Sequence, residues 1–522
     1  MKNGTCRTPP RLCDSNIIIN ALDPDTFAGD SRAVIDFLAG YYGDVERYPV
    51  QSEAEAGSLR RVLPDAAPEN GEAIDGILED VGQHILPGLT HFQSPNFFAY
   101  YPANASTAGF VGEMLCAGLN VVPFTWAASP LATELECLML DWMGKLMCLP
   151  DRFLFSGSGG VLHGSTCESV VCTLAAARDR ALKRLMTHEA ILKLVVYASD
   201  QSHTTFQKGA RIVGIPPSNF RVIPTSAASS YGLTAESVRD AVEADLASGL
   251  VPLYLCATVG TTGVGAVDPV GELGEVARRY GMWLHVDAAY AGSALICPEF
   301  HGYMEGAELA DSVSMNPHKW FLTNMDCCCL WVATPSQLTA SLSITSEYLN
   351  DVSSCDAEGE AVVDYKDWQI ALARRFRAIK LWVVLRRYGA AGLRAHIRRH
   401  VEMAKWLEQA FKADERFEVV APTRFSLVCF RLRPRPRPRP SGYGDGQVQA
   451  SQGVDPAAVV DALNRKLLKA VNASGRAFMV HTVVDNKFVI RVAIGATMTH
   501  MHHVRNVFHL IQEKATQIYT RN

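Results

Sequence analysis

Two ionisable residues of this sequence lie in segments that are otherwise apolar or made of small residues. Lys319 stands between Pro317-His318 and Trp320-Phe321, and Asp287 lies inside Leu284–Gly292, where an apolar run leads into small residues. A lysine in apolar surroundings has a lowered pKa, which makes it a nucleophile toward an aldehyde. A carboxylate at the end of a buried strand needs a cationic partner, and a protonated pyridine nitrogen provides one. The pair predicts a Schiff-base site for pyridoxal 5'-phosphate (PLP).

For Asp287 taken alone, an ion pair to an arginine and a metal ligand are the alternatives. No second carboxylate or histidine pair lies nearby in the sequence, which disfavours the metal site.

A glycine-rich segment, Phe155–Glu168, runs into a predicted helix. Backbone N–H groups at the start of a helix, together with hydroxyls such as those of Ser165 and Thr166, form a phosphate site. The segment lacks the Gly-Lys-Ser/Thr of a P-loop, and Leu162 stands where a dinucleotide fingerprint has its third glycine. A turn with a purely structural role is the alternative for this segment taken alone.

A histidine, His203, lies in the segment Ser199–Thr205, at the carboxyl end of a predicted strand. A lone histidine at such a place is more often structural. Beside Asp287 and Lys319, however, we expect His203 to stack on the cofactor ring and to contact the substrate carboxylate.

These residues require elements that hold them together, and the sequence predicts a mostly parallel sheet. Apolar runs without strict alternation are typical of strands covered on both faces, and here they alternate with helical segments that end near a glycine. Such alternation implies right-handed crossovers, with ligands at the carboxyl ends of the strands. The predicted strands are Leu192–Ala198, Pro252–Thr258, Met282–Val286, Ser312–Met315 and Cys328–Val332, and the helices are Ala235–Ala247 and Val270–Tyr280.

At 522 residues the chain exceeds what one hydrophobic core usually supports. We predict an N-terminal helical segment over 1–100, a large domain over 101–390 and a small α+β domain over 391–522. Within the small domain, residues 433–453 are predicted to form an extended, mobile loop, with a ligand for a proline-recognition module as the alternative. The remaining predicted elements are helices over Arg32–Tyr42 (capped by Asp30-Ser31), Gly71–Ile85, Ile370–Arg387 and Pro456–Val471, and strands over Phe425–Leu432 and Phe488–Ala493.

The composition, 48% hydrophobic and 20% charged, is typical of a globular protein. A net charge of -5 with scattered basic residues argues against nucleic acid or an anionic membrane as partner and favours a small-molecule substrate. Met1–Asn16 has no apolar core, and no long apolar run follows, so neither a signal peptide nor a membrane span is expected.

Fourteen cysteines without framework spacing predict reduced thiols in the cytosol. The run Cys327–Cys329 predicts a core strand, because adjacent strand residues point to opposite faces and cannot share a metal.

Together these motifs resemble the group II PLP-dependent decarboxylases, in particular plant decarboxylases of tyrosine, dopa or tryptophan. The resemblance runs from about residue 90 to the C-terminus and is carried by Val286–Gly292, Asn316–Lys319, Ser346–Leu349 and Asp364–Ile370. It implies an α/β fold of PLP fold type I (aspartate aminotransferase-like) and a carboxy-lyase that forms an amine and CO2. It also implies an obligate homodimer with the active site at the subunit interface.

The resemblance further implies roles for individual residues. Lys319 would carry the cofactor, Asp287 would keep its ring nitrogen protonated, and Tyr348 would donate a proton to the substrate Cα after CO2 is lost. The residues expected to bind the cofactor are Ser165, Thr166, Cys167, His203, Thr262, Asp287, Ala289, Asn316, His318 and Lys319. Those expected to bind the substrate are Tyr100, Pro102, His203, His318, Tyr348 and Ala373, with Val122 and Phe124 of the partner subunit and Arg491 as a contact for an anionic group.

Tyr348 and Ala373 bear on the product and the substrate. Tyr348 lies in Ser341–Val363, a polar stretch expected to act as a lid. Relatives that convert the same substrates oxidatively to aldehydes resemble this chain but have phenylalanine here, so tyrosine favours amine formation. Phenol-preferring relatives have serine at the Ala373 position and indole-preferring ones have glycine; Asp326–Trp331 resembles the tyrosine/dopa group. His163 replaces a glutamine that is usual in relatives.

Three other functions remain open. Aldehyde synthesis, or decarboxylation of an acidic amino acid, keeps the chemistry of Lys319 and Asp287 but changes the product. A non-catalytic PLP-binding or interaction protein is disfavoured by the intact set of Lys319, Asp287, His203 and Tyr348. A nicotinamide enzyme is disfavoured by the incomplete dinucleotide fingerprint.

Overall fold

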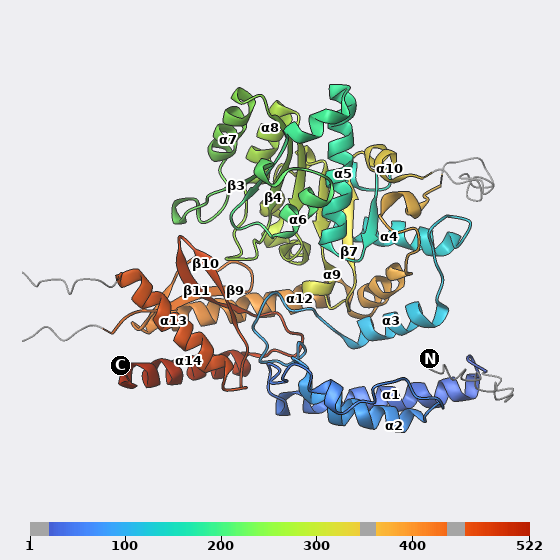
Figure 1. Cartoon of the computed structure of the whole chain (residues 1–522), viewed down its shortest axis with the longest axis vertical. Helices are drawn as coiled ribbons and strands as arrows, with labels where there is room; N and C mark the ends of the chain where they lie inside the picture. The colour runs from blue at the N-terminus through green and yellow to red at the C-terminus, as the bar shows by residue number, and fades with distance from the viewer. Residues whose placement is uncertain (1–19, 345–361, 436–454, 522) are drawn as a thin grey trace, which may run out of the picture. The chain divides into compact units, whose positions relative to one another are not determined.

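The computed structural model of the chain describes residues 20–344, 362–435 and 455–521. The chain divides into two compact units, residues 1–48 with 52–89 and residues 49–51 with 90–522. Figure 1 labels their helices and strands. In the described ranges, no helix combines the length and the apolar character needed to cross a membrane. The predicted domain limits at residues 100 and 390 stay a prediction.

Helices and turns make up the first unit. Helix α1 (Pro24–Asp44) begins where the Asp23 side chain accepts a hydrogen bond from the Thr26 N–H at 2.8 Å. The predicted cap at Asp30-Ser31 is wrong, because Pro24 fits the first turn of a helix and Asp23 caps it. The other helix is α2 (Ile74–Asp80), which continues as a π-helical turn over Val81–Ile85.

In the second unit, a seven-stranded sheet has the order β1-β7-β6-β5-β4-β2-β3. The five neighbouring strands β6, β5, β4, β2 and β3 are parallel to one another, whereas β7 is antiparallel to both β6 and β1. The predicted mostly parallel sheet is therefore confirmed. The strands are β1 (Gly160–His163), β2 (Leu194–Ser199), β3 (Phe220–Ile223), β4 (Val251–Thr258), β5 (Trp283–Asp287), β6 (Ser312–Met315) and β7 (Cys328–Val332).

Helices cover both faces of this sheet, and alternate strand residues enter two separate hydrophobic cores (Figure 1). In β2, Val195 and Tyr197 pack in the core that includes α7 and α8, whereas Val196 and Ala198 pack in the core that includes α5, α6 and α10. Burial on both faces explains the continuous apolar runs. The helices are α3 (Thr107–Leu119), α4 (Pro130–Leu146), α5 (Thr166–Leu185), α6 (Thr205–Ile212), α7 (Ala235–Ala247), α8 (Val270–Tyr280), α9 (Pro317–Trp320) and α10 (Pro335–Leu342).

Two predicted segments differ from the structure. Phe155–Glu168 is not one continuous loop, because its middle forms β1, which pairs with β7. The predicted helix over Ile370–Arg387 is wrong at its start, since α12 (Arg377–Ala413) begins seven residues later than Ile370. The residues before α12 are irregular and carry Ala373.

A four-stranded antiparallel sheet, in the order β10-β11-β9-β8, forms the C-terminal part of the second unit. The end of α12, together with α13 and α14, packs on it in a third hydrophobic core (Figure 1). The predicted α+β character of this region agrees with these elements. They are β8 (Phe417–Val419), β9 (Leu427–Leu432), β10 (Val480–Val484), β11 (Lys487–Ala493), α13 (Pro456–Asn472) and α14 (Met501–Arg521).

Gly306 makes a contact that a larger residue cannot make. Its φ is +87°, and a Cβ atom there would lie 2.1 Å from Cα of Gly271 in α8. We expect Gly306→Ala to lower the free energy of unfolding by about 3 kcal/mol through strain and overlap. In the control Gly249→Ala, φ is +75° but no atom lies within 4 Å of the added Cβ. Only backbone strain of about 1 kcal/mol then applies. Urea unfolding measures both losses, and equal losses would contradict the steric argument.

Candidate active site

Asp287 and Lys319 lie where parallel strands of the large sheet end. Asp287 is the last residue of β5, and it is paired with Thr258 of β4 and Ser314 of β6. Lys319 lies in α9, which directly follows β6. The Ala288 N–H donates a hydrogen bond to the carbonyl oxygen of Ser314 at 2.9 Å and so joins the two strand ends. The carboxylate and the amine therefore emerge at one edge of the sheet.

Lys319 is half-buried, and the Asp287 carboxylate interacts with it electrostatically. Burial lowers the pKa of the Lys319 ammonium, and the negative charge of Asp287 opposes part of this shift. Asp287 is 4% exposed, and its Oδ1 accepts a hydrogen bond from the Ala289 N–H at 2.9 Å. This bond orients the carboxylate, while desolvation makes the amine a better nucleophile.

His203, in the loop after β2, interacts electrostatically with both of these residues. Its Nδ1 accepts a hydrogen bond from the Thr205 N–H at 3.1 Å, so the neutral ring carries its proton on Nε2. Burial lowers the pKa of His203, the charge of Lys319 lowers it further, and the charge of Asp287 raises it. The ring therefore stays neutral at neutral pH and offers an N–H donor.

A cleft of about 290 Å³ opens beside His203. Its wall includes Thr262, from the loop after β4, and Arg491, from β11 of the small sheet. Arg491 is 3% exposed, and its Nε donates to the carbonyl oxygen of Gly263 at 2.9 Å. Its Nη2 has no hydrogen-bond partner among the residues the structure describes. Residues from both sheets therefore meet around one cleft.

The start of α5 coincides with the predicted phosphate site. Ser165 is the N-cap residue, but its side chain makes no capping hydrogen bond. Thr166 Oγ1 donates to Asn316 Oδ1 at 3.0 Å, and Thr205 Oγ1 donates to Cys167 Sγ at 2.7 Å. The first N–H groups of a helix lack partners within the helix, so this uncapped start can bind an anion.

Ala289 and His318, both predicted to contact the cofactor, are buried. The carbonyl oxygen of Ala289 accepts a hydrogen bond from the Asn316 N–H at 3.1 Å, which links the Asp287 loop to the Lys319 loop. His318 Nδ1 lies 2.6 Å from the carbonyl oxygen of Cys327. Burial and the charge of Lys319 lower the pKa of His318 to about 4, so this ring is neutral.

The predicted substrate-binding residues come from several loops. Tyr100 is 52% exposed and has a φ of 54°, and Pro102 next to it is buried. Val122 is exposed, Phe124 is half-buried, and Ala373 is exposed. Their part in the site stays a prediction. Tyr348 lies outside the described residues, as does most of the predicted lid.

Some side chains near the site were not predicted. His481, from β10, lines the cleft beside His203. No sequence motif around His481 indicates this, because the contact joins two segments that are far apart in the sequence. Cys328 Sγ lies 3.3 Å from Ser169 Oγ, on the α5 side of the sheet. Its neighbours Cys327 and Cys329 pack in the opposite core, as strand alternation predicts. Within the described ranges, no group of three or more His, Cys, Asp or Glu side chains is arranged to hold a metal ion.

Buried bonds hold the irregular segment that carries Ala373. His163 Nε2 lies 2.9 Å from the carbonyl oxygen of Trp368. Arg374 Nη2 donates to Glu136 Oε1 at 2.6 Å, and both of these side chains are buried. The exposed Ala373 is therefore followed at once by a firmly held residue.

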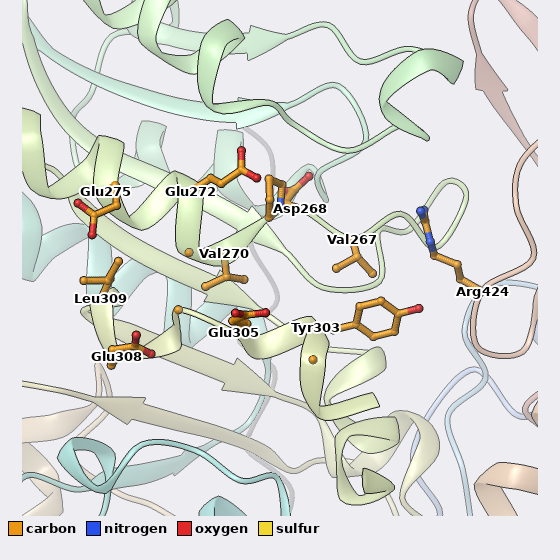
Figure 2. A pocket seen from close by; sticks show the side chains of 14 residues that line it. Val267, Asp268, Val270, Glu272, Glu275, Tyr303, Glu305, Glu308, Leu309 and Arg424 are labelled. Atoms are coloured by element: carbon orange, nitrogen blue, oxygen red, sulfur yellow. The ribbon is translucent and has the colours of Figure 1, made fainter. Parts of the chain in front are cut away.

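A larger hollow has a volume of about 620 Å³, and Figure 2 shows the side chains that line it. None of the predicted site residues lines it. Burial raises the pKa of Asp268 to about 6, although its oxygens accept hydrogen bonds from the N–H groups of Leu233 and Thr258, each at 2.7 Å. Size alone therefore does not identify the active site. The charged residues that line this hollow, and not the active site, are Asp268, Glu272, Glu275, Glu305, Glu308 and Arg424.

Comparisons with known proteins agree with this geometry. The family described as pyridoxal-dependent decarboxylase conserved domain matches residues 56–433. Tyrosine decarboxylase of Papaver somniferum is 52% identical over 96% of this chain and 96% of its own. Phenylacetaldehyde synthase of a Rosa hybrid cultivar is 52% identical over 97% of this chain and 96% of its own. The structure of Oryza sativa TDC with PLP and tryptamine superposes with a TM-score of 0.90 at 42% identity, over 96% of this chain and 100% of that one.

Proposed function

Because the chain belongs to the pyridoxal-dependent decarboxylase family, we propose that it removes the α-carboxyl group of an aromatic L-amino acid with PLP bound at Lys319. Membership confirms the predicted family, the α/β fold of PLP fold type I, the carboxy-lyase class and the cofactor. The roles of individual residues, the product and the subunit arrangement are our assignments.

One observation carries the proposal: the Lys319 amine and the Asp287 carboxylate emerge from neighbouring parallel strands, near the uncapped start of α5. An aldehyde needs an amine, a pyridine nitrogen needs a carboxylate, and a phosphate needs N–H and hydroxyl donors. Thr166 and Asn316, which are bonded to each other, connect the start of α5 to the Lys319 loop. The residues present therefore fit PLP.

When bound, the cofactor supplies a pyridine ring that takes up the electrons released as the bond to the carboxylate breaks. Asp287, oriented by the Ala289 N–H, keeps a proton on the ring nitrogen. His203 offers its Nε2 proton to the substrate carboxylate, and Arg491, which lines the same cleft, is assigned to an anionic group. The desolvated Lys319 amine would hold the cofactor through its aldehyde.

For the return of a proton to the substrate Cα, we assign Tyr348. The assignment rests on the resemblance of Ser346–Leu349 to family members that form amines. The aldehyde product is the second candidate, because a phenylacetaldehyde synthase is as similar to the chain as a tyrosine decarboxylase is. Identity over the whole chain does not separate the two products, whereas one proton donor does.

For the substrate, we propose tyrosine or dopa, with tryptophan as the alternative. The tyrosine decarboxylase relative supports a phenolic ring, and the tryptamine-bound neighbour supports an indole ring. Ala373, exposed before Arg374, is intermediate in size between the serine and the glycine of the two groups. Its small side chain leaves room for either ring.

We propose a homodimer that shares the site between its subunits. On α3, the exposed apolar residues Val111, Met114, Leu115 and Leu119 form one stripe at helical spacing, beside the buried face of Ala108, Gly112 and Cys116. Monomers rarely leave such a stripe open to water. On α4, which follows, Leu131, Leu138 and Trp142 are also exposed.

A cytoplasmic location is also part of the proposal. The cysteines in the described residues are all free, and most of them are buried. Free, buried thiols fit a reducing compartment.

Replacing the lysine tests the function directly. We expect the purified chain with PLP to release CO2 and an amine from tyrosine, dopa or tryptophan, and Lys319→Ala to lower kcat at least about 1,000-fold, because the nucleophile is lost. Glutamate and phenylalanine serve as comparison substrates. Lys183→Ala, an exposed lysine on α5, is the control. Normal turnover by Lys319→Ala contradicts the proposal, and an inactive parent chain that still binds PLP favours the non-catalytic alternative.

The product depends on the proton donor. We expect Tyr348→Phe to lower amine formation and to raise aldehyde, ammonia and peroxide, because the carbanion equivalent is then no longer protonated and reacts with oxygen. Amine and aldehyde are measured by chromatography and peroxide by a coupled assay. An unchanged product ratio, or aldehyde as the main product of the parent chain, overturns the role of Tyr348.

A charge on the α3 stripe tests the dimer. We expect Leu115→Glu to shift the mass in analytical ultracentrifugation from dimer toward monomer and to lower activity with it, because a buried charge costs several kcal/mol. Leu246→Glu is the matched control, since Leu246 on α7 is 44% exposed and Leu115 is 40% exposed. A parent chain that sediments as a monomer with full activity rules out the shared site.

A further inference from the structure

A stack of three aromatic rings, two buried and one half-buried, lies next to residues of the site, and each ring directly follows a residue assigned to the cofactor or the substrate. The rings belong to Tyr101, Tyr290 and Trp320, which follow Tyr100, Ala289 and Lys319 respectively. Consecutive residues share one peptide plane, so the placement of each ring constrains the residue before it. The stack therefore connects loops that are far apart in the sequence.

The rings are close to parallel. Tyr101 and Tyr290 have centroids 3.5 Å apart and planes 8° apart, and Tyr290 and Trp320 have centroids 5.1 Å apart and planes 14° apart. The Arg491 guanidinium lies 5.3 Å from the Tyr101 centroid at one end. At the other end, the ring of His400, from α12, is almost parallel to that of Trp320, with planes 4° apart and centroids 6.2 Å apart. The stack thus runs from the cleft to α12.

Each ring makes a hydrogen bond that restricts how the side chain can rotate. The Tyr101 hydroxyl donates to the carbonyl oxygen of Thr261 at 2.8 Å. The Tyr290 hydroxyl lies 2.6 Å from Ser426 Oγ. Apolar packing alone does not need such bonds, and a buried polar group that loses its partner is costly. The bonds therefore hold the rings in one arrangement.

The third polar bond lies at Trp320, next to Lys319. The indole Nε1–H donates to His400 Nδ1 at 2.9 Å, which requires a neutral His400. Burial keeps the pKa of His400 well below its ordinary value, and the neighbouring His396 lowers it further. His400 is therefore neutral, and able to accept this bond, at neutral pH.

We propose that Tyr290, the central ring, is a positioning residue that holds Lys319 in register with Tyr100 and Arg491. This inference rests on the proposed roles of Lys319 and Tyr100. Moving one end of the stack relative to the other displaces the attachment point of the cofactor from the surface that receives the substrate. A misplacement of about 1 Å between reacting groups lowers a rate roughly 100-fold.

The test compares variants that remove the ring with variants that keep it. Tyr290→Leu removes the ring, and Tyr290→Phe removes only the hydroxyl. Phe411→Leu is the matched control, because Phe411 is fully buried and stacks on Phe430 at 4.1 Å in the core of the small sheet. The readouts are the thermal midpoint without cofactor, the PLP dissociation constant from equilibrium dialysis, and kcat and KM for tyrosine. Borohydride reduction and mass spectrometry give the fraction of chains with cofactor fixed on Lys319.

We expect Tyr290→Leu to lower kcat about 100-fold, with a smaller change in KM, and to lower the fixed fraction at Lys319. Tyr290→Phe is expected to lose less than about tenfold in kcat. Phe411→Leu is expected to lower the thermal midpoint without changing the fixed fraction. Equal effects of Tyr290→Leu and Phe411→Leu on kcat and on the fixed fraction overturn the proposal, because the stack is then ordinary core packing.

A milder pair keeps the test decisive if Tyr290→Leu does not fold. His400→Leu removes the acceptor of the Trp320 bond, and His400→Asn restores an acceptor close to the position of Nδ1. We expect the leucine variant to lower the fixed fraction and kcat about fivefold and the asparagine variant to recover most of the loss. No recovery, or no loss, overturns the proposal. Failure of the Lys319→Ala experiment is a separate result, since it concerns the function and not the stack.

Discussion

The parallel pairing of β5 with β6 is the constraint on which the site depends. Asp287 and Ser314 are register partners, so the two strands end at the same edge and release the next residues into the same space. The carbonyl of Ser314 and the carbonyl of Ala289 then accept hydrogen bonds across the two loops. A shift of the register by one residue would turn the Asp287 side chain to the other face of the sheet. The register of the sheet therefore determines where the Asp287 carboxylate lies relative to the Lys319 amine.

Much of this arrangement could be predicted from the sequence, because the chemistry lies next to strong apolar runs. β6 and β7 have their predicted bounds, and β5 differs by one residue at each end. β1 was missed because four residues between glycines give too short a pattern to separate from a loop. The segment before α12 was predicted as helix because its residues favour helix locally. Hydrogen bonds that the Gln369 side chain donates to backbone carbonyls, together with the Arg374–Glu136 pair, hold it in another form.

The contribution of the small sheet was harder to predict, since it depends on contacts between residues far apart in the sequence. Arg491 was named only through a resemblance, and its position beside His203 became visible in the folded chain. Ser426 and His400, which hold the Tyr290 and Trp320 rings, have no sequence signal of a role near the site. Both come from the C-terminal part of the second unit, so the geometry around Lys319 depends on that part as well as on the large sheet.

Two exposed residues that we propose to contact the substrate are each followed by a residue whose side chain is held by a polar bond, and the two kinds of position are free to change to different degrees. Ala373 is exposed and Arg374 is buried in an ion pair, just as Tyr100 precedes the tethered ring of Tyr101. Mutation at the exposed member costs little stability, whereas mutation at the buried member costs much. After gene duplication, one copy can therefore accept substitutions at the exposed positions that change its substrate or product, while selection for stability keeps the buried residues. Such a difference between exposed and buried positions agrees with the existence of a tyrosine decarboxylase and a phenylacetaldehyde synthase that are each 52% identical to this chain.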